Sequence, residues 1–183
     1  DIPAAEFRKA IKNPGALGLP DYADGHVEGF LFPATYDVPP GASAVSVLRQ
    51  MVTRFKQAAA DVDLEGSDLS PYELVTLASL LEVEARESSD YGKVSRDVRN
   101  RIKEGMPLQF DSTIHYVFKD DKRKLTLDDL KVSSPYNTYT NPGLPAGPVI
   151  RINPWGAREA RLRAATSSGA WPRSSSPLTW PTV

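Results

Sequence analysis

Two glutamates offer acid–base chemistry from within the apolar run Leu77–Ala85. An isolated charge buried among apolar side chains is costly, so a segment that only packs has little use for carboxylates there. Either Glu82 and Glu84 reach solvent at the edges of the apolar face, or at least one of them is kept for proton transfer. Which of these holds decides what kind of protein this is.

The helix that must carry both glutamates has a clear start. Ser70 suits the N-cap, Pro71 the first helical position and Glu73 a capping box, and the pattern predicts a helix that continues to about residue 87. At 100° per residue, Glu82 and Glu84 fall about 80° to opposite sides of the apolar stripe. Residues two apart on a helix do not share a local site, so they are not a ready-made acid/base pair.

Glu82 is a candidate general acid because of its neighbours. Val75 and Ala78 flank it on the helix, and partial desolvation by such side chains raises the pKa of a carboxyl group. Arg86, four residues further on, could act in the opposite direction by favouring the carboxylate. A purely structural role, with both glutamates half-exposed or held in ion pairs, stays open.

The other elements are predicted from caps and apolar periodicity. Helices are expected at 4–11, from Ser43 to about residue 60, at 91–102 and within 106–118 after a short extended segment, with a helical turn at 127–130. Residues 133–154 form a long polar loop, and such loops commonly carry function. The predicted fold class is α+β: a helical core that carries the catalytic glutamate, with short strands and long loops that shape a groove.

Composition limits the classes of protein to consider. The chain has 183 residues, 40% of them hydrophobic, and a net charge of −1, which suits one globular domain and predicts no nucleic-acid partner. There is no cysteine, and the only histidines, His26 and His115, lack a paired ligand spacing and are interpreted as solvent or packing residues. We therefore expect no metal and no cofactor. A Gly-x-Ser-x-Gly elbow and a glycine-rich phosphate loop are absent as well.

The chain carries no apolar run near the roughly 20 residues that span a bilayer. It begins abruptly at Asp1, without an initiator methionine or a signal peptide. We interpret it as an excised or processed fragment, and we expect the full protein to be anchored by a segment that this chain does not contain.

Several sequence blocks stand in order along the chain: EGFLFPATY at 28–36, LASLLEVE at 77–84, MPLQFDSTIHY at 106–116, SPYNTY at 134–139, GLPAGPVI at 143–150 and NP at 153–154. Together they resemble the YceG-like (MltG-type) endolytic murein transglycosylases of the bacterial envelope. Any one block is a weak signal, but the ordered series is highly specific.

The resemblance implies cleavage of the β-1,4 bond between N-acetylmuramic acid and N-acetylglucosamine within glycan strands. It assigns catalysis to the first glutamate of the Glu-x-Glu motif, which is Glu82. As an acid this group protonates the glycosidic oxygen, and as a base it takes the proton of the muramic C6 hydroxyl. That hydroxyl attacks C1 and forms a 1,6-anhydro end without water. One carboxyl group suffices, in contrast to the two-carboxylate plan of most glycosidases.

The resemblance also implies roles for other residues in the matched blocks. Gln109, Tyr136, Asn137 and Thr138 suit hydrogen bonds to N-acetyl groups and hydroxyls, or support of Glu82. These residues carry amide or hydroxyl groups that can donate and accept hydrogen bonds.

The remaining acidic residues of the blocks have two interpretations each. Glu28 and Asp111 are either supporting carboxylates or loop anchors bonded to backbone N–H groups. Glu84 is expected in a structural ion pair or hydrogen bond. Core or groove-wall positions, with sugar stacking open for one of them, are expected for Tyr36, Tyr116 and Tyr139.

The chain departs from the family pattern at several positions. Ser112 and Ala146 stand where prolines are usual, and both changes are tolerable. After Asn153-Pro154 the expected alanine-rich helix and strand are replaced by an irregular sequence, which would leave a sheet edge open. A change of reading frame near residue 155 is one hypothesis, and sequencing the coding DNA would test it.

These inferences combine into a domain organisation and a function. Residues 1–27 are expected to connect to a LysM-like region, 28–165 to form the catalytic domain and 166–183 an irregular Ser/Pro-rich tail. The expected function is that of a lytic transglycosylase, a carbon–oxygen lyase that could terminate nascent glycan strands. Alternatives are a catalytically silent peptidoglycan-binding or scaffolding module, or an ordinary glycoside hydrolase that leaves reducing ends.

The resemblance implies partners and a location too. Peptidoglycan glycan strands are the expected substrate, and proteins of cell-wall synthesis are possible partners. The expected location is the extracytoplasmic face of the bacterial plasma membrane, with anchoring by a helix outside this chain.

Overall fold

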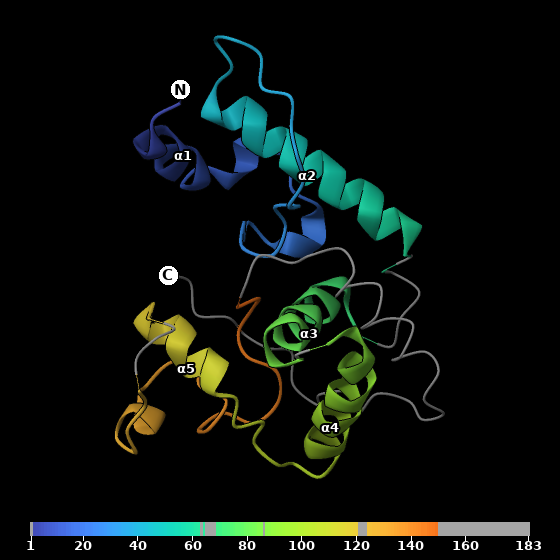
Figure 1. Cartoon of the computed structure of the whole chain (residues 1–183), viewed down its shortest axis with the longest axis vertical. Helices are drawn as coiled ribbons and strands as arrows, with labels where there is room; N and C mark the ends of the chain where they lie inside the picture. The colour runs from blue at the N-terminus through green and yellow to red at the C-terminus, as the bar shows by residue number, and fades with distance from the viewer. Residues whose placement is uncertain (1, 63, 65–68, 86, 121–123, 150–183) are drawn as a thin grey trace.

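The computed structural model describes residues 2–62, 64, 69–85, 87–120 and 124–149, and in these ranges the chain is built from helices and loops (Figure 1). The α-helices are α1 (Ala4–Ile11), α2 (Ala44–Asp61), α3 (Pro71–Glu84), α4 (Tyr91–Lys103) and α5 (Asp111–Phe118). Short 3-10 turns are η1 (Pro14–Ala16), η2 (Asp21–Ala23), η4 (Ser88–Asp90) and η5 (Asp129–Lys131). The starts of the five α-helices follow the sequence prediction closely, and α3 differs from it at its end.

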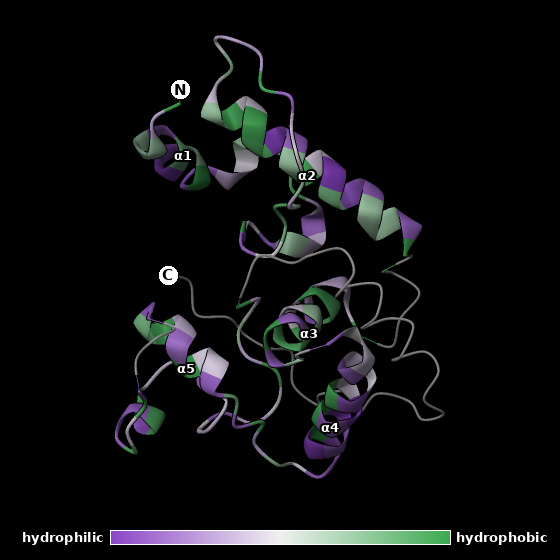
Figure 2. Ribbon diagram, viewed as in Figure 1, coloured by the Kyte–Doolittle hydropathy of each residue, from purple (hydrophilic) through white to green (hydrophobic). Residues whose placement is uncertain are grey.

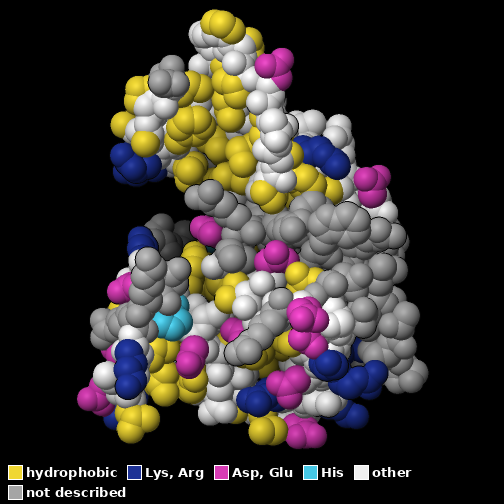
Figure 3. All heavy atoms as spheres, in the orientation of Figure 1, with side chains coloured by type: hydrophobic (Ala, Val, Ile, Leu, Met, Phe, Trp, Pro, Cys, Tyr) yellow, Lys and Arg dark blue, Asp and Glu magenta, His cyan; other side chains and the backbone are white. Residues whose placement is uncertain are grey.

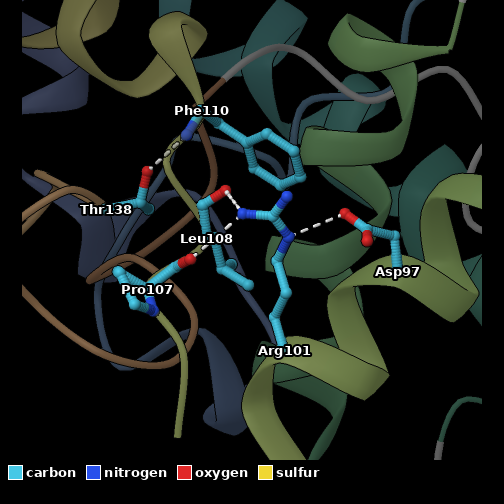
Figure 4. A network of polar contacts seen from close by, with 6 residues as sticks. All are labelled: Asp97, Arg101, Pro107, Leu108, Phe110 and Thr138. Carbon is cyan, nitrogen blue, oxygen red and sulfur yellow. Dashed lines mark hydrogen bonds and ion pairs between the residues drawn. The ribbon is translucent and has the colours of Figure 1, made fainter. Parts of the chain in front are cut away.

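The prediction of an α+β fold is wrong, because no strand occurs in the described ranges. The segment of residues 106–110 before α5, where a short extended stretch was predicted, shows why. The Arg101 guanidinium on α4 donates to the carbonyls of Pro107 and Leu108 at 3.3 and 3.2 Å (Figure 4). The Thr138 hydroxyl accepts the N–H of Phe110 at 2.9 Å. Side chains thus satisfy backbone groups that would otherwise pair with a neighbouring strand.

Helix α3 is the centre of the lower part of the molecule and contacts α4, α5 and η2 (Figure 1). Its N-terminus is fixed by the predicted capping box, in which Ser70 accepts from the Glu73 N–H and the Glu73 side chain accepts from the Ser70 N–H. All eight residues from 74 to 81 are buried, so the helix is covered on every side rather than along one stripe. Figure 2 shows it as the most hydrophobic helix of this region.

Helix α3 ends earlier than the sequence predicts. Ala85 adopts an extended conformation with φ −83° and ψ 123°, which makes Glu84 the last helical residue. Glu82 lies in the final turn. Both carboxylates therefore lie at the open end of a buried helix, where side chains can reach polar surroundings.

Helices α1 and α2 pack against each other and form a second apolar cluster, which includes Ala10, Leu17, Val27, Leu48 and Val52. Hydrophobic side chains gather over these helices on the face shown in Figure 3. The segment 1–27 thus shares a core with α2. The predicted domain division itself stays a prediction, and its tail and the end of the predicted catalytic region lie outside the described residues.

Helices α4 and α5 end as local rules require. Gly105 follows α4 with a φ of +67°, a left-handed conformation that glycine adopts without strain. Lys119 ends α5 in the same region, with a φ of +56°. Before η5, the Thr126 hydroxyl accepts the Asp129 N–H at 3.3 Å.

The loop of residues 133–149 returns across α3. Gly29 approaches Pro148 so closely that a Cβ on the glycine would lie 2.6 Å from the proline Cγ. The predicted loop character is confirmed up to residue 149, whereas residues 150–154 and the proposed change near residue 155 lie outside the described residues. Among the described residues, no helix is both long and apolar enough to cross a bilayer.

Candidate active site

A cavity of about 940 Å³, here called the α5 cavity, lies between the end of α3, helix α5 and nearby loops. Helix α3 contributes its last two residues, Val83 and Glu84. The loops contribute Glu28, Ser134, Tyr136 and Val149. Helix α5 and the two residues after it contribute Asp111, Ser112, His115, Tyr116, Val117, Lys119 and Asp120. The volume is that of a typical ligand pocket.

Glu84 is the α3 carboxyl group that lines this cavity. The side chain is half-buried, and the Ser112 hydroxyl on α5 donates to Oε1 at 2.5 Å. Burial raises the pKa of Glu84, the Ser112 hydrogen bond lowers it in part, and the Asp111 carboxylate raises it again. A carboxyl with a raised pKa holds its proton closer to neutral pH, as a general acid must.

Glu82, the residue predicted to be catalytic, lies elsewhere. It is half-buried at the opposite side of the same turn, where the Tyr91 hydroxyl at the start of α4 donates to Oε2 at 3.0 Å. It does not line the α5 cavity. The separation of the two glutamates follows the predicted helical geometry. The catalytic assignment of Glu82 stays a prediction, and Arg86, which was considered as a group favouring its carboxylate form, lies outside the described residues.

Asp111 is the first residue of α5 and lines the cavity beside Glu84. Tyr139 donates from its hydroxyl to Asp111 Oδ1 at 2.5 Å. Burial and then the Asp111 carboxylate raise the pKa of Tyr139 to about 12, so the phenol remains a proton donor at neutral pH. This bond ties the loop of residues 133–149 to α5.

Two tyrosines and Glu28 form another part of the cavity wall. The rings of Tyr116 and Tyr136 lie 4.8 Å apart between centroids and are tilted by 41°. Burial first, and the Glu28 charge in addition, raise the pKa of both phenols. Tyr136 and Glu28 are therefore among the predicted site residues that the structure brings to the cavity. Tyr36 instead donates to the Phe32 carbonyl at 2.7 Å.

Asn137 and Thr138 do not line the cavity, and their hydrogen bonds stabilise the loop of residues 133–149. The buried Asn137 amide donates to the Leu130 and Val132 carbonyls at 3.0 and 2.8 Å. The buried Thr138 hydroxyl lies 2.9 Å from that of Thr113 on α5. Their contacts hold the loop that presents Tyr136 to the cavity.

Gln109 is exposed and likewise outside the cavity lining. Its φ of +57° places it in the left-handed region, where a residue with a Cβ is strained. Its backbone N–H donates to the Thr138 carbonyl at 3.0 Å. Gln109 thus forms the turn that leads into α5. The predicted substrate-binding roles of Gln109, Asn137 and Thr138 stay predictions.

Sequence reasoning missed several residues of the cavity, namely Ser112, His115, Lys119 and Asp120. His115 lies 2.8 Å from the Asp120 carbonyl through Nδ1. Asp111 and His115 are four residues apart, which places them on one face of α5, and this spacing was an available signal. No group of three or more potential ligands among the described residues is arranged to hold a metal ion.

The site is therefore a helix-borne carboxyl group with a raised pKa at the wall of a polar and aromatic cavity, a pattern suited to acid–base chemistry. The chain belongs to the YceG-like family, whose model matches residues 4–167. This is the class that the sequence blocks indicated.

Two relatives of the chain are named by their activity. An endolytic murein transglycosylase of Bacillus subtilis (strain 168) is 38% identical over 149 residues, which cover 78% of this chain and 37% of that protein. One from Streptococcus pneumoniae (serotype 2, strain D39) is 32% identical over 130 residues, or 67% of this chain and 24% of that protein. The chain thus spans about a third or less of these relatives.

A solved structure agrees with the fold. A crystal structure of a YceG-like protein from Listeria monocytogenes matches with a TM-score of 0.71 and 29% sequence identity. The match covers 94% of this chain and 55% of the other.

Proposed function

We propose that this chain is the catalytic part of an endolytic lytic transglycosylase that cleaves the β-1,4 bond between N-acetylmuramic acid and N-acetylglucosamine in peptidoglycan. Family membership and the names of the relatives support the reaction class. The observation that carries the proposal is Glu84: one half-buried carboxyl with a raised pKa on the wall of a cavity of about 940 Å³.

The acid/base role in this proposal goes to Glu84 rather than to Glu82. Each glutamate accepts one hydroxyl hydrogen bond, Glu82 from Tyr91 and Glu84 from Ser112, but of the two only Glu84 lines the α5 cavity. A lytic mechanism needs one group that is protonated at the start and a carboxylate halfway through, and the raised pKa of Glu84 suits the first state. A single group also agrees with the separation of the two glutamates on α3.

The reaction can be written with all atoms balanced. The Glu84 carboxyl donates its proton to the glycosidic oxygen while the bond between that oxygen and C1 of the muramic residue breaks. The resulting carboxylate takes the proton of the muramic C6 hydroxyl, whose oxygen forms the new bond to C1. The products are a free hydroxyl on the leaving sugar and a 1,6-anhydro ring, and Glu84 is protonated again.

The remainder of the cavity suits this transition state and substrate. The Asp111 carboxylate, held by Tyr139, lies on the same wall and can stabilise the positive charge that develops at the sugar ring. Tyr116 and Tyr136 offer ring faces to the sugar and neutral hydroxyl groups to its polar substituents.

Product analysis tests the proposed function. Purified protein is incubated with peptidoglycan, and the fragments are identified by mass spectrometry. We expect 1,6-anhydro ends from the wild type, a loss of about 100-fold or more in Glu84→Gln, and activity within a few-fold of wild type in Glu82→Gln. The two variants change the same helical turn in the same way and control for each other.

The opposite results have distinct meanings. Loss of activity in Glu82→Gln alone would restore the sequence-based assignment of Glu82. Reducing ends in place of anhydro ends would indicate a glycoside hydrolase, and binding without fragments would indicate a silent binding module.

The proposed location is the extracytoplasmic face of the bacterial plasma membrane, in contact with cell-wall synthesis proteins and nascent glycan strands. The murein named in the relatives' activity supports a cell-wall substrate. Glycan strands isolated from cells that carry Glu84→Gln should be longer than wild-type strands if the enzyme terminates their elongation. Unchanged strand lengths would contradict that role.

A further inference from the structure

Helix α5 is followed by a lysine in a backbone conformation that favours glycine. Lys119 has a φ of +56° and a ψ of +32°, which lie in the left-handed region. Its N–H donates to the Tyr116 carbonyl at 3.2 Å, and the Asp120 N–H donates to the His115 carbonyl at 3.2 Å. These are the two hydrogen bonds of a Schellman motif, in which glycine is the usual residue because a Cβ is strained there.

This lysine is one of the residues that line the α5 cavity. Among the described lining residues it is the only Lys or Arg, whereas four carboxyl groups line the same cavity: Glu28, Glu84, Asp111 and Asp120. At a rise of 1.5 Å per residue, the helix from Asp111 to Lys119 spans about 12 Å. The permanent cation of the cavity and the carboxyl group of Asp111 therefore belong to opposite ends of α5.

The helix dipole does not explain why a lysine stands at this position. A cation in the last turn of a helix interacts favourably with the dipole without any left-handed backbone. Glycine or asparagine would end α5 with less strain. A strained residue at the wall of a site is commonly retained for what its side chain does there. The ammonium group of Lys119 is suited to a negatively charged group of the ligand.

We propose that Lys119 is a specificity-determining residue that binds a carboxylate of the peptide stem on a muramic residue of the substrate. The glycan backbone of peptidoglycan is uncharged, since an amide bond joins the lactyl group of each muramic residue to its stem. The stem ends in a carboxylate and so supplies the anion. The proposal rests on the proposed function as a peptidoglycan-cleaving enzyme, and it is independent of which glutamate of α3 transfers the proton.

Three substitutions separate the charge of Lys119 from its backbone. Lys119→Gln removes the cation and keeps the Cβ, Lys119→Arg keeps the cation, and Lys119→Gly removes both the cation and the strain. Lys131→Gln is the matched control for the loss of one positive charge, because Lys131 is exposed, bonds Asp128 and does not line the cavity. We expect Lys119→Gly to raise the melting temperature by about 2 °C, which would show that lysine is retained at a cost in stability.

The substrate is changed in a matched way as well. Native glycan strands are compared with strands whose stem carboxylates have been converted to amides by a carbodiimide and an excess of ammonia. The two preparations have the same glycan backbone and the same stems, and they differ in negative charge. Mass spectrometry of the anhydro ends gives kcat and KM for each protein on each substrate.

For the wild type and Lys119→Arg, we expect amidation of the stems to lower kcat/KM by about 3- to 10-fold, mainly through a higher KM. For Lys119→Gln and Lys119→Gly, amidation should change kcat/KM by less than about 2-fold, because the cation that distinguishes the two substrates is gone. Lys131→Gln should respond as the wild type does. High salt should reduce the wild-type preference, since an exposed ion pair is screened.

The outcomes distinguish this proposal from the proposed function. If the wild type forms no anhydro ends from either substrate, the proposed function fails, and calorimetric titration with the two strand preparations then decides the role of Lys119. Tighter binding of native strands that Lys119→Gln lacks supports the proposal, and equal binding overturns it. If the protein is active but the wild type and Lys119→Gln respond equally to amidation, Lys119 does not bind the stem. An equal loss of kcat on both substrates in Lys119→Gln would likewise overturn the proposal and indicate a structural role.

Discussion

The backbone N–H of Val149 donates a hydrogen bond to the Ser79 hydroxyl at 3.0 Å within the core. Ser79 lies on α3 and is fully buried, and its own hydroxyl donates to the Thr76 carbonyl at 2.7 Å. Val149 lines the α5 cavity, and Glu84 follows Ser79 on the same helix. One buried serine thus ties the cavity wall to the helix that presents the candidate acid.

Ser79→Ala should lower the free energy of unfolding by about 1–3 kcal/mol, because the Val149 N–H is left buried without a partner. Urea denaturation measures the change. Ser95→Ala is the matched control, since the buried Ser95 hydroxyl has no hydrogen-bond partner among the described residues and should cost less than about 0.5 kcal/mol. Equal losses in the two variants would contradict the role assigned to Ser79.

Gly29→Ala should be much more harmful than Gly41→Ala. Both glycines have positive φ, +86° and +81°, so both substitutions carry the strain of the left-handed region. At Gly29 the new Cβ would lie 2.6 Å from Pro148, whereas at Gly41 no atom of the described residues lies within 4 Å. We expect an additional loss of about 1–3 kcal/mol at Gly29 in the same denaturation assay. A similar cost at both positions would show that Pro148 moves aside freely.

Glu84→Gln should raise the melting temperature at neutral pH, by on the order of 2 °C. The folded-state pKa of Glu84 is raised, so the stability linked to its protonated form is complete below the unfolded pKa and is lost as the pH rises through the folded pKa. The advantage of the variant should therefore grow with pH and vanish on acidification.

Calorimetry from acidic to neutral pH measures the melting temperatures of wild type and Glu84→Gln. Glu82→Gln serves as the control for removal of one negative charge from the same turn. A melting-temperature difference between wild type and Glu84→Gln that stays constant with pH would contradict the burial of this carboxyl.

Gln109→Gly should stabilise the fold by about 0.5–1 kcal/mol without a loss of activity. Glycine relieves the strain of the φ of +57° but gives up more chain entropy, and the difference is the expected gain. Asp24→Gly, at a φ of +46°, is the control for the same backbone effect. A stable Gln109→Gly variant that loses activity about 10-fold or more would support the substrate-binding role predicted from the sequence.

Local sequence signals predicted the starts of the central helices well. Ser43 and Ser70 form the capping boxes of α2 and α3 in the structure, because each box needs only residues within four positions of one another. The end of α3 was not predictable in the same way. Ala85 is a good helix former, yet the helix stops before it.

Which of the two glutamates lines the α5 cavity depends on the tertiary structure. Helical geometry predicts that they lie on opposite sides of α3, as the structure shows, and α5 packs on the side of Glu84. The partner of Glu84 is Ser112, and that of Glu82 is Tyr91, from two different helices. A pattern within α3 alone carries no information about which of these helices encloses an open space.

The absence of strands among the described residues has a similar origin. An extended segment was predicted before α5, but Gln109 turns there with a φ of +57°, and Arg101 bonds the carbonyls of Pro107 and Leu108. β-propensity and periodicity depend on the residues of the segment itself. They do not indicate whether a side chain such as that of Arg101 will bond the backbone groups that a neighbouring strand would otherwise pair with.

The contact between Gly29 and Pro148 has a consequence for biosynthesis. The two residues belong to the first and one of the last sequence blocks, so nearly all of the region between them must leave the ribosome before they can meet. Helices α1 and α2 can pack earlier, since their partners are close in sequence. The α5 cavity, by contrast, cannot close on a nascent chain. Glu84 therefore acquires its surroundings only near the end of translation of this region.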